Sequence, residues 1–279
     1  MYNRRSESLP FIIPVAKEQK GGKGRGMQKK LRISGSTLKL IALISMLMDH
    51  TAAVVFPCLM IKHEVYCIDF SVEYASMALS QGGAGWLYIL YQVMRRGSGR
   101  LAFPVYCFLL VEGFERTRSR ARYACRLFLF ALISEVPFDL AFHARSVFVY
   151  YQNVFFTLLL GFLMMWAMKA LEERALMPLL RWAGTGFAFL AAAFAAEAIY
   201  CDYGANGITA IALLYLFRKN KWRQIFAGII AFLWEITAPL AFLFIGLYDG
   251  KRGLRLKYVF YLFYPLHLLI LYYISTLLL

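Results

Sequence analysis

The sequence predicts an all-α fold, a polytopic bundle of transmembrane helices, from three observations. Hydrophobic residues make up 61% of the 279 positions and charged residues only 17%. A soluble domain of this length needs a more polar surface than that composition supplies. Aromatic residues alone account for 17% of the chain, which is typical of helices that anchor at membrane interfaces. Short basic clusters alternate with long apolar runs, as in proteins that cross the membrane repeatedly.

Apolar runs define the expected spans, since a helix needs about 20 apolar residues to cross the hydrocarbon core. The clearest candidates are 37–60, 121–142, 147–168, 182–200 and 257–278. The shorter candidates, which charges and Gly or Pro residues bound, are 101–115 and 203–217.

The stretch 222–248 allows two interpretations. As one long span, it would place the basic residues that follow it outside the cell. As two short segments folded back near 234–239, it keeps those residues inside. We prefer the folded-back form, because short helices are tolerated where they line a cavity within the protein. The bundle then has about nine crossings, within a range of eight to ten.

Residues 1–36 form a flexible basic tail, with nine Lys or Arg against two Glu. The tail has a Gly-rich stretch and no apparent cleavable signal peptide. The positive-inside rule places it in the cytoplasm and makes residues 37–279 a transmembrane domain, multi-pass in the plasma membrane. The same rule explains the net charge of +15, so we expect the lipid bilayer as a partner and no nucleic acid.

The stretch 82–94 is too short to span and reads as an amphipathic helix that leads into the second crossing. It leaves Arg95, Arg96 and Arg100 on the outer side, against the positive-inside rule. An exception of this kind requires an explanation from the structure.

Ionisable residues lie within the expected spans, at a cost of roughly a few kcal/mol each unless they are paired or hydrated. They are Asp49, His50, Glu112, Glu135, Asp139, Glu197, Glu235 and His267. The topology gathers most of the polar residues in the outer half of the bundle. We expect the catalytic residues to be His50, Asp49, His267, Glu135 and Asp139. We expect a polar, substrate-binding cluster of Arg100, Glu112, Asn153 and Asp202.

On the inner side, Arg118, Arg122 and Arg126 recur at four-residue steps. They predict one stripe at the start of the third span, 121–142. A row of guanidinium groups can bind phosphates bidentately. An ordinary positive-inside anchor explains the same pattern equally well.

Together, the two polar regions predict group transfer across the membrane from a phosphorylated cytoplasmic donor. His50 would act as general base on an amine or hydroxyl, with a carboxylate orienting it. In the structural alternative, each His only donates a hydrogen bond to a neighbouring helix. We expect no metal, because His50 and His267 lack a local third ligand. No phosphate-binding loop, nucleophile elbow or dinucleotide fingerprint occurs.

Many segments of residues 34–279 resemble, in order, the motifs of the TraX family of membrane proteins. They are 38–42, 48–50, 99–104, 112–114, 131–140, 152–158, 202–204, 247–253 and 258–269. The resemblance implies acetylation of the N-terminal amino group of a conjugative pilin subunit, with acetyl-CoA as donor and Arg118, Arg122 and Arg126 as its binding residues. A looser likeness to membrane acyltransferases extends the acceptors to a glycan or a lipid. Asp249 stands where the family often has Asn.

Two other functions compete with a membrane-embedded acetyltransferase. The first is an ion-coupled transporter or permease, although the chain shows no internal repeat with corresponding broken helices. The second is a non-catalytic component of a conjugation or secretion complex, which leaves the intramembrane charges without a purpose.

Overall fold

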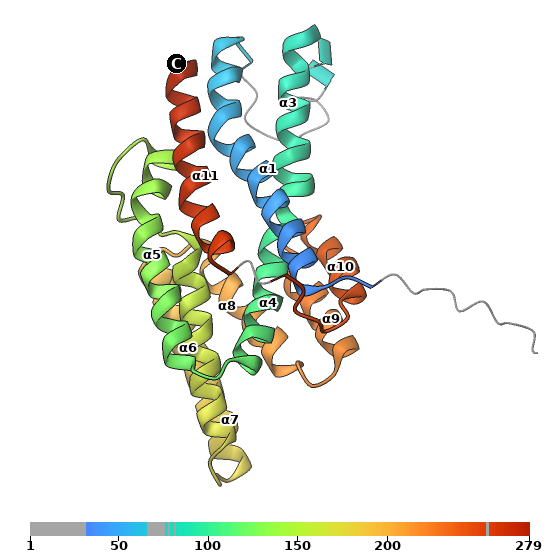
Figure 1. Cartoon of the computed structure of the whole chain (residues 1–279), viewed down its shortest axis with the longest axis vertical. Helices are drawn as coiled ribbons and strands as arrows, with labels where there is room; N and C mark the ends of the chain where they lie inside the picture. Colours follow the sequence, from blue (N-terminus) through green and yellow to red (C-terminus); the bar gives the residue numbers. More distant parts are fainter. Residues whose placement is uncertain (1–31, 66–75, 78, 81, 255–256) are drawn as a thin grey trace, which may run out of the picture. The chain divides into compact units, whose positions relative to one another are not determined.

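The computed structural model describes residues 32–65, 76–77, 79–80, 82–254 and 257–279. The described chain from Arg32 onwards forms one unit, and its regular structure is helical (Figure 1). Most of the expected basic tail and most of residues 62–80 lie outside the described residues.

The helices follow one another through short loops and turns. The α-helices are α1 (Gly35–Lys62), α3 (Gly85–Gln92), α4 (Ala102–Arg116), α5 (Arg120–His143), α6 (Val154–Glu172), α7 (Pro178–Ala198), α8 (Gly204–Leu216), α9 (Lys221–Ala231), α10 (Ala241–Leu247) and α11 (Lys257–Leu278). Tighter or wider turns form η1 (Gly82–Ala84), η2 (Val93–Gly97), η3 (Ser98–Leu101) and η4 (Ala238–Leu240). The central helix α4 packs against α1, α6, α8 and α10, whereas α11 lies between α1 and α5.

Within the described residues, four helices are long and apolar enough to cross a membrane: α1, α6, α7 and the Val259–Leu278 part of α11. The expectation of eight to ten spans is therefore too high for full-length spans. The expected span 121–142 forms the 24-residue α5, whose charged residues keep it out of this set. Gly, Pro and polar residues cut the other apolar stretches into shorter helices, such as the 13 residues of α8 and the 11 of α9.

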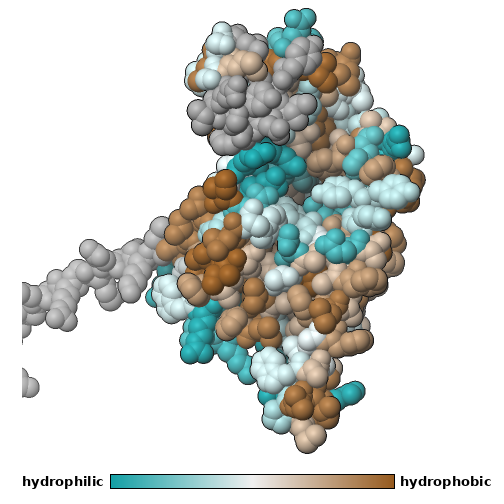
Figure 2. All heavy atoms as spheres, turned by 180° about the vertical axis from the view of Figure 1, so that it is seen from behind, coloured by the Kyte–Doolittle hydropathy of each residue, from teal (hydrophilic) through white to brown (hydrophobic). Residues whose placement is uncertain are grey.

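Apolar side chains cover much of the surface. Along α7, Phe187 and Phe194 are 74% and 76% exposed, which is a surface suited to lipid. Figure 2 shows hydrophobic residues over most of the described face, with hydrophilic residues gathered across its middle. The described part of the chain therefore has the surface of a membrane protein.

The folded-back interpretation of 222–248 is confirmed, since α9 and α10 form an antiparallel hairpin. Lys221 at the start of α9 donates from Nζ to the carbonyl oxygens of Gly246 and Tyr248, each at 2.8 Å. Gly228 allows the two helices to approach, because a Cβ there would lie 2.1 Å from the Phe242 ring. The hairpin returns the chain to the end from which α11 begins (Figure 1).

The segment 82–116 is a helix interrupted at η2 and η3, where the backbone leaves α geometry. Ser45 Oγ donates to the carbonyl of Ser98 at 2.6 Å and to that of Gly99 at 2.9 Å. Thr237 Oγ1 donates to the carbonyls of Arg96 and Gly97. These hydroxyls satisfy carbonyls that the interruption frees, so a broken helix can persist inside a membrane bundle.

Candidate functional site

A pair of histidines from two different helices lies among the residues that were expected to form the outer polar region. His50 of α1 and His267 of α11 approach edge to edge, with 2.6 Å between His50 Nδ1 and His267 Nε2. The side chain of His267 is buried, at 4% exposure. The rings of Phe142 and Tyr264 border His50 with their centroids 5.4 Å and 5.8 Å away. The pair is thus packed in an aromatic surround.

The hydrogen bonds fix the tautomers of both neutral rings. His267 Nδ1 lies 2.7 Å from the carbonyl oxygen of Phe263, which can only accept, so Nδ1 carries the proton. His267 Nε2 is then the acceptor, and His50 Nδ1 must donate to it. The Nε2 atom of His50 is therefore left unprotonated, as a general base requires.

The expected carboxylate does not orient His50, and the adjacent Asp49 points elsewhere. Consecutive residues of an α-helix point about 100° apart, and Asp49 turns towards the interrupted helix. Its Oδ2 lies 2.6 Å from Arg95 Nη1. Gly99 permits this approach, because a Cβ there would lie 2.7 Å from Asp49 Cβ. The group that orients His50 is His267.

The exceptional outer arginines also find their explanation here. Arg95 is paired with Asp49, and Arg100 Nε lies 3.5 Å from Glu235 Oε1 in the turn after α9. The two guanidinium groups are thus turned into the protein against carboxylates, where a charge is tolerated. They neutralise acidic groups of the site instead of marking a cytoplasmic loop.

Asp202 joins the same region from the turn between α7 and α8. Its Oδ1 accepts from the Tyr151 hydroxyl at 2.8 Å, and the charges of Asp49, Arg95 and Arg100 act on its carboxylate. Loss of hydration, which outweighs the Tyr151 hydrogen bond, raises the pKa of Asp202 to about 6.

The other predicted polar residues have bracing contacts. Asn153 donates from Nδ2 to Glu135 and, at 2.8 Å, to the carbonyl of Ala131, while its Oδ1 accepts from the backbone of α6. Asp139 accepts from the backbone N–H of Phe148 at 2.7 Å. Glu135 and Asn153 therefore link α5 to α6, and Asp139 holds the loop between those helices.

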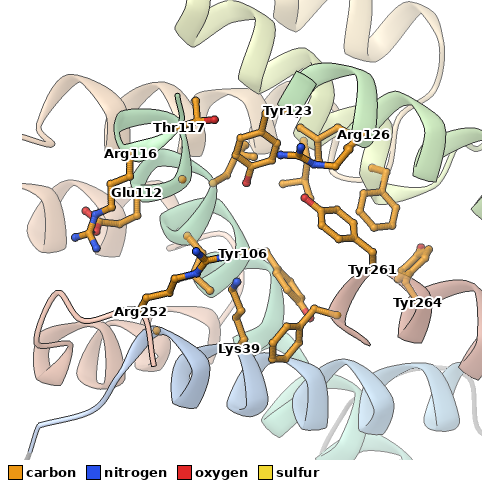
Figure 3. A pocket seen from close by; sticks show the side chains of 18 of the residues that line it. Lys39, Tyr106, Glu112, Arg116, Thr117, Tyr123, Arg126, Arg252, Tyr261 and Tyr264 are labelled. Atoms are coloured by element: carbon orange, nitrogen blue, oxygen red, sulfur yellow. The ribbon is translucent and has the colours of Figure 1, made fainter. Parts of the chain in front are cut away.

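A cavity of about 600 Å³ lies between α1, α4, α5, α6 and α11. Five basic side chains line it, namely Lys39, Arg116, Arg118, Arg126 and Arg252, and Lys39, Arg116 and Arg252 lie towards one end (Figure 3). Figure 3 shows Lys39 and Arg252 pointing into this space, with Tyr261 and Tyr264 further along it. The walls are aromatic and aliphatic, so the cavity suits an elongated ligand with an anionic end.

The deep end of the cavity adjoins the histidines on two helices independently. Gly35, Lys39 and Met46 line it along one face of α1, and His50 follows Met46 by four residues on that face. On α11, Tyr264 lines the cavity, and His267 stands one turn further. From Gly35 to Met46, the helix rises by roughly 16 Å. The cavity thus extends along α1 from its basic end towards the imidazoles over about this distance.

The arginine stripe is only partly as predicted. Arg118 precedes α5, whose N-cap is Ser119, so it shares no helical register with the two later arginines. Arg118 and Arg126 line the cavity, whereas Arg122 is exposed on the surface. Glu112 also belongs to this end, paired with Arg116 at 2.5 Å, and not to the outer cluster.

Sequence reasoning missed Lys39 and Arg252, which face the same space and act on each other electrostatically. Among the described residues, no carboxylate pairs with either of them. A Lys inside the first apolar run was the available signal for Lys39. For Arg252, the loop 247–253 gave no sign that it would turn towards α1.

The fold and the site together define a helical membrane protein. It has a histidine pair near one end of a cavity whose other end carries basic residues. The chain belongs to the TraX family, since the model of that family, described as TraX protein, matches residues 34–275. A curated relative, the "Probable fimbrial assembly protein FimC, serogroup H1" of Dichelobacter nodosus, is 30% identical over 275 residues. The match covers 88% of this chain and 97% of the relative. No solved structure matches the chain significantly.

Proposed function

We propose that the protein is a membrane-embedded acetyltransferase that moves an acetyl group from cytoplasmic acetyl-CoA to an amine or hydroxyl near the outer face. The observation that carries the proposal is the cavity, which has a basic mouth and, on α1 and α11, ends about one helical turn short of the histidine pair, whose one free nitrogen is His50 Nε2. The phosphates of CoA suit the mouth, and its linear pantetheine arm suits the walls.

The orientation follows from the charges at the mouth. Lys39, Arg116 and Arg252 lie at the end of the bundle where α1 begins and α4 ends. Basic residues of this kind favour the cytoplasmic side, where acetyl-CoA is made. We therefore place the N-terminus in the cytoplasm and the protein as a multi-pass component of the plasma membrane.

In the proposed reaction, His50 Nε2 takes a proton from the acceptor nitrogen or oxygen as that atom attacks the thioester carbonyl. A bond from the acceptor to the acetyl carbon forms, the carbon–sulfur bond breaks, and His50 returns the proton to the departing thiolate. His267 accepts from His50 Nδ1 throughout. The chain of hydrogen bonds to the Phe263 carbonyl stabilises the transient imidazolium.

The acceptor is an exposed amine or hydroxyl on a peptide, a glycan or a lipid. The name of the Dichelobacter nodosus relative refers to fimbrial assembly, which supports a pilus-related peptide, such as the N-terminus of a pilin. The outer polar residues around His50 would receive it. Acetylation there would remove a positive charge from the acceptor.

Label transfer tests the proposal. Purified protein in lipid vesicles is incubated with acetyl-labelled acetyl-CoA and with membranes of the source cell, and the labelled product is separated and identified. Label on a peptide, glycan or lipid that needs the wild-type protein supports the proposal. Coupled ion flux without any labelled product supports the transporter instead.

A non-catalytic role in assembling a fimbrial or conjugative complex is the remaining alternative, and the relative's name favours it. That role requires no free base at the end of a cavity. It predicts that variants of His50 assemble the complex as the wild type does, a result that the acetyltransferase proposal excludes.

A further inference from the structure

The turn between α7 and α8 has a backbone that non-glycine residues rarely adopt. Tyr200 and Tyr203 have positive φ angles of 55° and 65°, and Gly204 follows at 41°. A Cβ on Gly204 would lie 2.4 Å from Glu197 Oε1. Such conformations persist where the surroundings over-determine them, and they cluster at functional sites. The residue that this turn presents is Asp202.

Asp202 is held on three sides. Its N–H donates to the carbonyl of Gln152 at 2.8 Å, and its own carbonyl accepts from the Thr157 hydroxyl. The Tyr151 hydroxyl donates to its Oδ1. A bridge between Gln152 and Cys201 joins the two loops, so the carboxylate keeps one position relative to the bundle.

The carboxylate faces groups that also surround the histidine pair. The titratable groups that interact with it are Asp49, Arg95, Arg100, Tyr151, Cys201, Tyr203 and Tyr264. Glu135 and Glu197 act on the adjacent Cys201. Tyr264 belongs to both groups of residues, since the charge of Asp202 acts on it and its ring lies 5.8 Å from the ring of His50 and 5.8 Å from that of His267. At the other side, Tyr151 is 37% exposed, so the Asp202–Tyr151 pair reaches the surface.

The proposed acetyl transfer to an amine leaves a proton over. A protonated amine loses two protons as its nitrogen bonds to the acetyl carbon. One of them goes to the thiolate that leaves, and the other must exit the site. Hydrolysis of acetyl-CoA to acetate and the thiol has the same surplus. A buried imidazole pair needs a nearby group to take this proton before the next turnover.

We propose that Asp202 accepts this surplus proton from His50 by way of the Tyr264 hydroxyl and releases it to solvent beside Tyr151. The proposal rests on the acetyltransferase function. The Tyr264 hydroxyl passes its own proton to the carboxylate and receives one from the imidazole, so protons and charges balance. Asp202 then acts as the proton acceptor of the site, and Tyr151 as its positioning residue.

The acidity of Asp202 suits this exchange. Loss of hydration raises its pKa to about 6, so the carboxylate holds a proton more firmly than an aspartate of ordinary acidity does. The Tyr151 hydrogen bond and the charges of Arg95 and Arg100 counteract the rise.

The experiment measures release of free CoA thiol from acetyl-CoA by full-length protein in vesicles, with water or alaninamide as acceptor, from pH 5 to 8. Because the ionised form of Asp202 accepts the proton, wild-type turnover should rise with pH through a midpoint near 6. Asp202→Asn should lower turnover roughly tenfold and abolish the rise of turnover with pH near 6. Tyr151→Phe should move the midpoint to higher pH, since the carboxylate loses a donor.

Glu197→Gln is the matched control, because the amide oxygen can still accept from the Ala205 N–H that Glu197 binds, and it should keep the wild-type profile. Unchanged midpoints in both Asp202→Asn and Tyr151→Phe would overturn the proposal. If Asp202→Asn fails to fold, an unchanged Tyr151→Phe midpoint overturns it alone. Wild-type protein that releases no thiol would instead overturn the acetyltransferase function itself.

Discussion

His50 Nδ1 and His267 Nε2 lie 2.6 Å apart, and this contact between α1 and α11 leaves His50 Nε2 as the free nitrogen of the pair. Because His267 is in turn hydrogen-bonded to a helix carbonyl, the tautomers of both rings follow from the backbone. The packing of α1 against α11 therefore determines that His50 Nε2 is unprotonated and can act as a base.

The first prediction concerns His267 as the partner that fixes this tautomer. His267→Phe should lower kcat by about two orders of magnitude or more, in the range lost with a correctly positioned general base, with little change in KM for acetyl-CoA. His267→Gln keeps an acceptor and should recover part of the loss. Equal kcat losses in both variants would show that the ring serves packing alone.

The second prediction concerns the unpaired cations at the cavity mouth. Lys39→Met and Arg252→Gln should each raise KM for acetyl-CoA about tenfold, because each removes a charge that faces the ligand phosphates. The effect should shrink at high salt. Arg122→Gln, at an exposed position outside the cavity, should leave KM unchanged. A fall in kcat alone in the Lys39 and Arg252 variants would contradict the assignment.

The third prediction concerns the Asp49–Arg95 ion pair. Arg95→Met leaves a buried carboxylate without its partner, which should cost about 3–5 kcal/mol of stability. Adding Asp49→Asn should restore much of that loss. Thermal unfolding in detergent measures both effects, with exposed Arg174→Met as the control for a surface charge. Additive losses in the double variant would mean that the two side chains act independently.

The fourth prediction concerns the hairpin of α9 and α10. Gly228→Leu should disrupt it, since even a Cβ would collide with the Phe242 ring. Gly246→Ala has room, with the nearest atom 3.9 Å from the added Cβ, and should be tolerated. Protease access to the loop 232–237 distinguishes the two. Equal resistance of both variants would show that α9 and α10 do not pack as described.

Much of the architecture was predictable because hydrophobicity and charge act along the chain. The apolar runs located α1, α6, α7 and α11, and the basic residues after 248 predicted the hairpin. The lengths of α8, α9 and α10 were not predictable as spans. Their short helices are held by packing against α4 and against each other, which no local pattern encodes.

The sequence identified most residues of the site, but it did not predict which of them contact one another. The cost of a buried charge singled out His50 and His267, and the expected topology added Asp202 to the polar cluster. Their partners depend on helix rotation, so the sequence suggested a carboxylate for His50, whereas the structure provides His267. Arg95 stood out as an exception to the charge rule, and its ion pair with Asp49 became visible only when α1 and η2 were packed together.

Turnover of acetyl-CoA by a His50 variant tests the central claim most directly. His50→Ala and the control His63→Gln, at the exposed end of α1, are compared with wild-type protein in vesicles for release of CoA thiol and for labelled product. The account predicts that His50→Ala binds acetyl-CoA and remains folded but loses activity by a factor of at least about 100, while His63→Gln stays active. A His50→Ala protein that turns over at the wild-type rate would contradict the account.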